Sequence, residues 1–159
     1  TLKPDQPQTE VWVNGLRFLG YDLPQTAYRP GDTLYLTLYY YLDRPIQPGH
    51  SVFVHLSGPP NPETGNVLWG QDDGGPCRGL YPMKFWQAGS SVMAKMAISI
   101  PKNAPTNVPP DCGYELAIGF YNWKTGERIP LADTVPHVVG PVNEDEVVLT
   151  QIHIRPPQF

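Results

Sequence analysis

The sequence has little charge, few cysteines and no long apolar run, and each shortage excludes a class of protein. Only 16% of its 159 residues are charged and the net charge is −4, which argues against a nucleic-acid-binding protein, because such proteins usually carry a basic patch. No stretch approaches the roughly 18 consecutive apolar residues of a membrane-spanning helix. The start carries no signal-peptide pattern and no Met, so we expect a domain cut from a longer chain or a processed product.

Sequence motifs of catalysis and cofactor binding are also missing. The chain has no G-x-S-x-G elbow, no G-x-G-x-x-G loop and no H-E-x-x-H pair, and its four histidines are scattered. The pair Asp72 and Asp73 could in principle ligate calcium, but a turn capped by these side chains is the simpler interpretation. We therefore expect no catalytic residue, no metal site and no cofactor.

The two cysteines, Cys77 and Cys112, both lie in Gly/Pro-rich loops. A pair of loop cysteines is typical of a disulfide formed in an oxidising compartment. Such a bridge would stabilise the fold by about 3–4 kcal/mol in the chain-entropy model. We predict the bridge and an extracytoplasmic location; two free thiols are the alternative.

The chain is rich in proline and glycine, and in several segments apolar residues occupy every second position. Its 20 prolines exclude a helical bundle. In the segment 33–42, Leu34, Leu36 and Leu38 alternate with polar or tyrosine residues. In the segment 51–56, Val52 and Val54 alternate with Phe53 and His55, which would point to the other face of the strand. This period of two predicts half-buried strands. We expect about eight, at 17–23, 33–42, 51–56, 67–71, 92–100, 113–121, 127–131 and 147–154.

Strands of this kind, separated by turns, predict an all-β fold. Two antiparallel sheets packed face to face would bury the alternating apolar faces, as in immunoglobulin-like or jelly-roll-like sandwiches. The polar stretch 1–10 is interpreted as a linker, and residues 11–159 as one β-sandwich domain.

Aromatic residues are the remaining feature with chemical content. Four tryptophans and nine tyrosines accompany few charges. Exposed rings stack on the apolar faces of sugars, while neighbouring polar groups bind the hydroxyls, and ligand sites combine such surfaces. Packing within and between strands is the alternative role of any one ring. The candidate glycan-binding residues are Trp69, Gln71, Asp72, Tyr81, Trp86 and Trp123.

Five segments together resemble a known family. They are FLGYDL (18–23), PGDTLYLTLYY (30–40), SVFVHL (51–56), GQDDGGPCRGLYPMKFWQAG (70–89) and GYELAIGFYNWKTGERIPL (113–131). In this order they resemble the extracytoplasmic β-sandwich domain that follows the membrane part of bacterial glycosyltransferases similar to dolichyl-phosphate-mannose–protein mannosyltransferases.

The resemblance implies a noncatalytic accessory domain. Its partners would be a membrane-embedded part of the same parent chain and a glycan, with no nucleic acid, and any catalysis would lie in the membrane part. The alternative function is a structural or protein-interaction β-sandwich.

Overall fold

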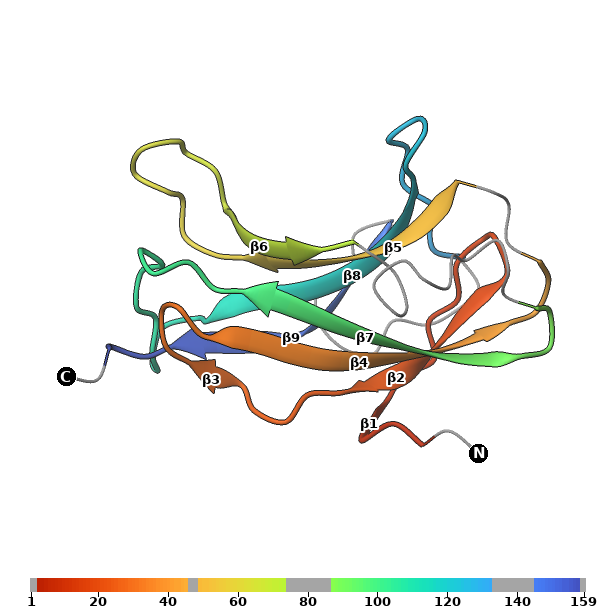
Figure 1. Cartoon of the computed structure of the whole chain (residues 1–159), viewed down its shortest axis with the longest axis horizontal. Helices are drawn as coiled ribbons and strands as arrows, with labels where there is room; N and C mark the ends of the chain where they lie inside the picture. The colour runs from red at the N-terminus through yellow and green to blue at the C-terminus, as the bar shows by residue number, and fades with distance from the viewer. Residues whose placement is uncertain (1–2, 46–48, 74–86, 133–144, 158–159) are drawn as a thin grey trace.

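The fold is an all-β sandwich. The computed structural model describes residues 3–45, 49–73, 87–132 and 145–157, and these contain nine strands and no helix. One sheet has the order β1–β2–β4–β7 and the other has the order β3–β9–β8–β5–β6. Figure 1 shows the two sheets as two layers. The predicted two-sheet architecture is thus confirmed.

The four-stranded sheet is built around the longest strand. Its members are β1 (Gln6–Pro7), β2 (Leu16–Asp22), β4 (Thr33–Leu42) and β7 (Ser91–Ser99), all antiparallel. Strand β1 lies inside the stretch predicted as a linker, so part of that stretch belongs to the sheet. The division of the chain at residue 10 stays a prediction.

The five-stranded sheet contains β3 (Ala27–Tyr28), β9 (Glu146–Ile154), β8 (Tyr114–Asn122), β5 (His50–Ser57) and β6 (Leu68–Asp72). Only the short β3–β9 pair among these strands is parallel. The segment 127–131, predicted as a strand, makes only the isolated bridges Tyr121–Arg128 and Trp12–Leu131. Pro130 has no N–H to donate, which limits a longer ladder there.

The core lies between the inner faces of the two sheets. The alternating leucines of β4 and valines of β5 are buried there, as predicted. Four aromatic rings pack at one end of this core, with centroid distances of 4.7 Å for Trp12–Phe120, 5.4 Å for Tyr40–Phe120 and 5.6 Å for Phe18–Tyr40. The two pairs that involve Phe120 are edge-to-face, and aromatic pairs in this geometry add to the stabilisation from burial.

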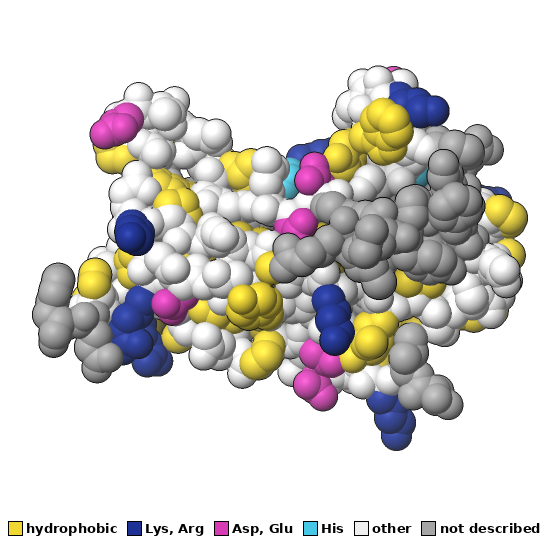
Figure 2. Space-filling view, in the orientation of Figure 1, with side chains coloured by type: hydrophobic (Ala, Val, Ile, Leu, Met, Phe, Trp, Pro, Cys, Tyr) yellow, Lys and Arg dark blue, Asp and Glu magenta, His cyan; other side chains and the backbone are white. Residues whose placement is uncertain are grey.

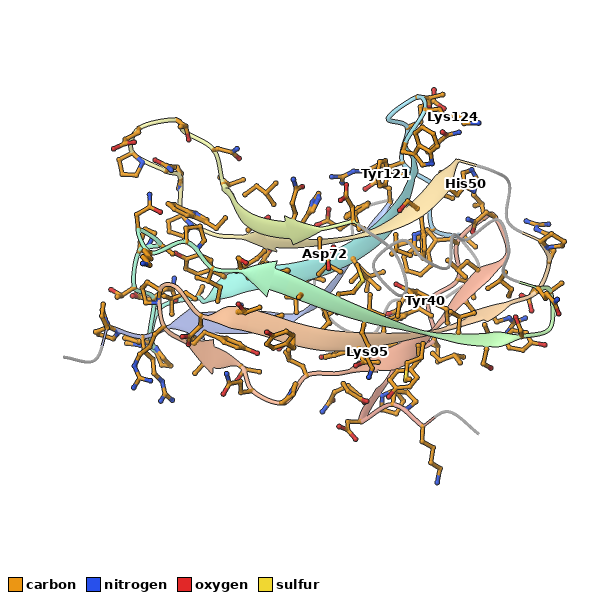
Figure 3. The ribbon with its side chains drawn as sticks, viewed as in Figure 1. Tyr40, His50, Asp72, Lys95, Tyr121 and Lys124 are labelled. Atoms are coloured by element: carbon orange, nitrogen blue, oxygen red, sulfur yellow. The ribbon has the colours of Figure 1, made fainter. Side chains whose placement is uncertain are left out.

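The two sheets also meet along one edge, where β6 lies against β7. An Ala side chain at Gly70 would place Cβ 2.4 Å from Cγ2 of Ile98, so glycine permits this close approach. Two residues later, Oδ2 of Asp72 accepts a hydrogen bond from the backbone N–H of Ala97 at 2.9 Å. Figure 3 places Asp72 between the ribbons of these strands.

Candidate functional site

The outer face of the five-stranded sheet carries the side chains that alternate with the core residues. On β5, Val52 and Val54 point into the core, so Phe53 and His55 point outward. The register pairs Phe53 with Gly119 and His55 with Ala117 on β8. Small residues therefore face the two rings across the sheet, which leaves room for the rings to lie over the neighbouring strand.

Phe53 is buried although it points away from the core. Its ring lies over Gly119, where an added Cβ would come within 2.4 Å of the ring. The His55 ring stacks against Phe53 at 4.4 Å, and the guanidinium carbon of Arg128 lies 4.8 Å from the Phe53 centroid. Tyr121 covers a further edge at 6.1 Å. These contacts leave Phe53 only 3% exposed, and an aromatic cluster forms on the outer face.

Arg128 is held in place by two carboxylates. Its Nη1 lies 3.0 Å from Oε2 of Glu146 and 3.3 Å from Oδ1 of Asp145. Burial raises the pKa of Glu146, and the nearby Arg128 opposes that rise. The guanidinium is thereby fixed over the Phe53 ring, a geometry typical of a cation–π contact.

Tyr121 and Asp73 form the opposite wall. The Tyr121 hydroxyl donates a hydrogen bond to Oδ2 of Asp73 at 2.8 Å, and the Ser51 hydroxyl donates to the Asp73 backbone carbonyl at 3.1 Å. Burial, together with the bond to Asp73, raises the pKa of Tyr121 to about 12. The phenol therefore stays protonated and acts as a donor at neutral pH.

These groups surround a hollow of about 280 Å³, which we call the first hollow. It is lined by Phe53, His55, Gln71, Asp73, Tyr121, Gly126 and Arg128. Two loops, residues 58–67 and 122–128, rise at the upper edge of Figure 1, and Figure 2 shows histidine, acidic and basic side chains at the base of the dip between them. Gln71 is exposed at the rim.

The hollow contains one histidine with an altered proton affinity. Burial lowers the pKa of His55, and the charge of Arg128 lowers it further, while Asp73 partly offsets both effects. A neutral imidazole at pH 7 can both donate and accept a hydrogen bond. His55 thus adds an uncharged polar edge to the aromatic floor.

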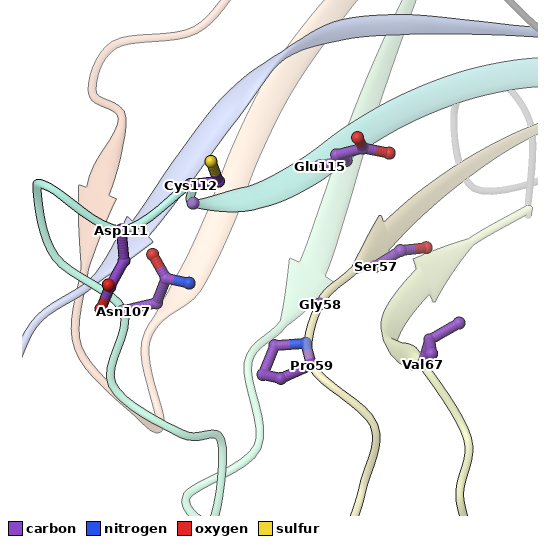
Figure 4. Close-up of a pocket in the computed structure, with 9 residues that line it drawn as sticks. Ser57, Gly58, Pro59, Val67, Asn107, Asp111, Cys112 and Glu115 are labelled. Carbon is purple, nitrogen blue, oxygen red and sulfur yellow. The ribbon is translucent and has the colours of Figure 1, made fainter. Parts of the chain in front are cut away.

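A second, wider hollow of about 620 Å³ lies further along the same face (Figure 4). The turn after β5 and the residue before β6 line one side, and the segment before β8 lines the other. The residues that line it are Ser57, Gly58, Pro59, Val67, Asn107, Asp111, Cys112, Gly113 and Glu115. We call it the second hollow.

The predicted glycan-binding residues have different environments. Gln71 lines the first hollow, whereas Asp72, the next residue, points toward β7 and bonds to it. Trp69 is 6% exposed, and its Nε1 donates to the Pro59 carbonyl at 2.7 Å. Trp123 is 61% exposed on the 122–128 loop, next to Lys124 at the loop tip in Figure 3. Tyr81 and Trp86 lie outside the described residues.

Six of the seven residues that line the first hollow, all except Gln71, were not predicted as ligand-binding residues. The alternation of β5 already placed Phe53 and His55 opposite the core, so their outward direction could be read from the sequence. Their contacts with Tyr121 and Arg128 could not be predicted, because these contacts depend on the β5–β8 pairing and on the path of the 122–128 loop.

The predicted disulfide involves one residue outside the described ranges. Cys112 is a free and exposed cysteine beside the second hollow, and Cys77 is not described, so the bridge stays a prediction. Within the described ranges, no group of three His, Cys, Asp or Glu side chains is placed to hold a metal ion. The same part of the chain contains no helix long and apolar enough to cross a membrane.

Comparison with known proteins identifies no family. No family model and no curated protein matches the chain. Among solved structures, the sporulation control protein Spo0M from Bacillus subtilis is similar at 12% sequence identity and a TM-score of 0.46. The alignment covers 89% of this chain and 50% of Spo0M, so the chain spans about half the length of that protein. At this level of similarity, neither a family nor a function follows.

Proposed function

We propose that this chain is a noncatalytic domain that binds carbohydrate in the first hollow. The observation that carries the proposal is the aromatic cluster of Phe53, His55 and Tyr121 on the outer face of the sheet, next to exposed hydrogen-bonding groups. Small-ligand sites combine apolar surface with a few polar groups in this way. A sugar needs both, because its ring has apolar C–H faces and its edge carries hydroxyls.

The polar groups of the first hollow suit hydroxyl ligands. Gln71 makes no side-chain hydrogen bond within the described structure, so its amide can both donate and accept. Asp73 uses Oδ2 for Tyr121, and its Oδ1 can accept from a sugar hydroxyl. Trp123 stands on the loop that contributes Gly126 to the hollow, and its exposed ring offers a further stacking surface on that loop.

The size of the hollow favours a small part of a glycan. Pockets for drug-sized ligands occupy roughly 300–1,000 Å³, whereas this one measures about 280 Å³. We therefore expect about one sugar unit to occupy it. Affinity would be modest, since a small contact area leaves little surplus over the cost of association.

The resemblance of the five segments supports the rest of the proposal. On that basis, the domain is an extracytoplasmic accessory part of a membrane glycosyltransferase-like protein. It would hold a glycan near a membrane-embedded partner in the same parent chain. The domain alone would have no catalytic turnover.

A glycan array tests the binding directly. The labelled 159-residue chain is applied at high micromolar concentration, with Gln71→Ala and Gln25→Ala in parallel. Gln25 is exposed too but lies far along the chain from the hollow, just before β3. We expect retention of a neutral glycan by the parent chain and by Gln25→Ala, and weaker retention by Gln71→Ala. Absence of binding to every glycan would refute the proposal.

A protein-interaction role is the second candidate, and a different surface favours it. On the outer face of the four-stranded sheet, Tyr35 is 61% exposed and Met93 is 43% exposed. Both belong to the alternate positions of β4 and β7 that point away from the core. If that face is the functional one, Tyr35→Ser should abolish partner binding and leave glycan binding unaltered.

A further inference from the structure

The second hollow lies in line with the first on the same sheet. Along β5 and β8, the register pairs Phe53 with Gly119, then His55 with Ala117, then Ser57 with Glu115. Phe53 and His55 line the first hollow, and both members of the last pair, Ser57 and Glu115, line the second. A strand rises about 3.3 Å per residue, so Phe53 and Ser57 are roughly 13 Å apart. That span is longer than one sugar ring.

The wall of the second hollow on the β6 side is held by internal bonds. Trp69 donates from Nε1 to the Pro59 carbonyl at 2.7 Å, and the Gly58 N–H donates to the Val67 carbonyl at 2.8 Å. Gly58 also packs on the Tyr114 ring, where an added Cβ would lie 2.6 Å away. Trp69 therefore positions the loop rather than contacting a ligand.

The opposite wall is fixed as well. The Tyr114 hydroxyl donates to the Pro105 carbonyl at 2.6 Å. Asn107 exchanges two backbone hydrogen bonds with Ile154 of β9, at 2.8 and 3.0 Å. Both walls are thus tied to the sheet, and binding sites of this kind are usually formed before the ligand arrives.

The chemistry of the second hollow is similar to that of the first. The Ser57 hydroxyl and the carboxylates of Asp111 and Glu115 can bond to hydroxyls, and Val67, 48% exposed, adds an apolar surface beside Pro59. Among the described lining residues there is no cation to balance Asp111 and Glu115. Acidic sugars would therefore be repelled, whereas the hydroxyls of a neutral sugar can donate to both carboxylates.

We propose that a linear oligosaccharide of neutral sugars lies along β5 and occupies both hollows at once. This inference rests on the proposed function, because it extends the glycan from the first hollow. It adds a substrate class, a neutral chain of more than one unit, and a second set of contacts. It also gives Glu115 and Val67 a role in selecting chain length.

Calorimetric titration with glucose, mannose and galactose and their linear oligomers, from monomer to pentamer, tests the proposal. For the series that binds, we expect affinity to rise about tenfold with chain length, as one or two added hydrogen bonds would give. Val67→Arg places a long side chain in the second hollow. It should remove this gain and leave the monomer affinity unchanged.

Val13→Arg is the matched control, since Val13 is 47% exposed and does not line either hollow. It should bind like the parent chain. Affinity that does not depend on chain length, with Val67→Arg equal to Val13→Arg, would overturn the two-hollow proposal and leave the first hollow as the site. Binding of no sugar in any series would instead overturn the proposed function itself.

Discussion

At the scale of single residues, the first hollow depends on one glycine. Gly119 has no side chain, and this absence allows the Phe53 ring to lie over β8 at this position. A Cβ there would also come within 2.9 Å of the Asp145 carbonyl, so neither neighbour can move away easily. The floor of the hollow therefore depends on the size of residue 119.

Gly119→Ala should lower the free energy of unfolding by about 1–3 kcal/mol, the usual cost of overpacking. Phe53→Leu removes the ring atoms that clash, so the double variant should lose less stability than the sum of the two single variants. Urea unfolding of all four proteins measures this coupling. Strict additivity would show that the ring does not lie over residue 119.

Sequence patterns predict the direction in which a side chain points better than they predict which residues it contacts. The alternation of β5 predicts that Phe53 points outward, and it does. It gives no sign that Arg128, which is distant in sequence, covers the ring. For Trp69, even the direction of the side chain is hard to predict. A bulge between Leu56 and Ser57 alters the β5–β6 register beside Trp69, and no sequence pattern predicts that bulge.

At the scale of the elements, each long strand buries one face. Leu36 on β4 is 3% exposed, whereas its neighbour Tyr35 is 61% exposed. Leu36→Asp should destabilise the domain by roughly 3–5 kcal/mol, because it buries a charge without a partner. Tyr35→Asp should cost less than about 1 kcal/mol. Thermal melting compares them, and a lower melting temperature for Tyr35→Asp than for Leu36→Asp would mean that β4 faces the other way.

The contact between β6 and β7 gives a second prediction at this scale. Asp72→Ala leaves the partly buried Ala97 N–H without its acceptor, so we expect a loss of about 1–3 kcal/mol. Asp72→Asn keeps an oxygen at the same position and should lose less. Chemical denaturation provides the measurement. An Asn variant as unstable as the Ala variant would indicate that the charge of Asp72, rather than its hydrogen bond to Ala97, is what stabilises this edge.

Long strands were predictable and very short ones were not. The strands β2, β4, β5, β6, β7, β8 and β9 begin and end within one residue of the predicted ranges. Strands β1 and β3 have two residues each, and a period of two cannot be recognised over such a length. They exist because neighbouring strands offer partners, which is a property of the assembled sheet.

At the scale of the whole molecule, stability should depend on pH through two partly buried histidines. Burial lowers the pKa of both His50 and His55 below 6.5. Between that value and the lower folded-state pKa, the unfolded chain binds more protons than the folded one. Stability is therefore full above pH 6.5 and falls as the pH decreases below it. The raised pKa of Glu146 acts in the opposite sense, in a lower pH range.

Melting temperatures measured from about pH 7.5 to about pH 5.5 test this dependence across the range in which histidines titrate. The parent chain should lose stability toward the acidic end, and His55→Gln should lose less. Identical profiles for the two proteins would show that His55 is not the group responsible.

The order of the strands in each sheet could not be predicted from the sequence. Alternation indicates which residues face the core, but it does not select the partner of each strand. The order β3–β9–β8–β5–β6 combines segments from both ends of the chain. The hollows arise only from this order, because their lining residues come from β5, β6, β8 and the segments that precede or follow these strands.

We propose that the outer face of the five-stranded sheet binds carbohydrate. Two-dimensional amide NMR of the labelled chain, titrated with the sugar retained on the array, is the decisive measurement. We expect shifts concentrated at Phe53, Gln71, Tyr121 and Gly126, with Tyr35 and Met93 on the opposite sheet unchanged. Shifts confined to Tyr35 and Met93, or no shifts at saturating sugar, would contradict it.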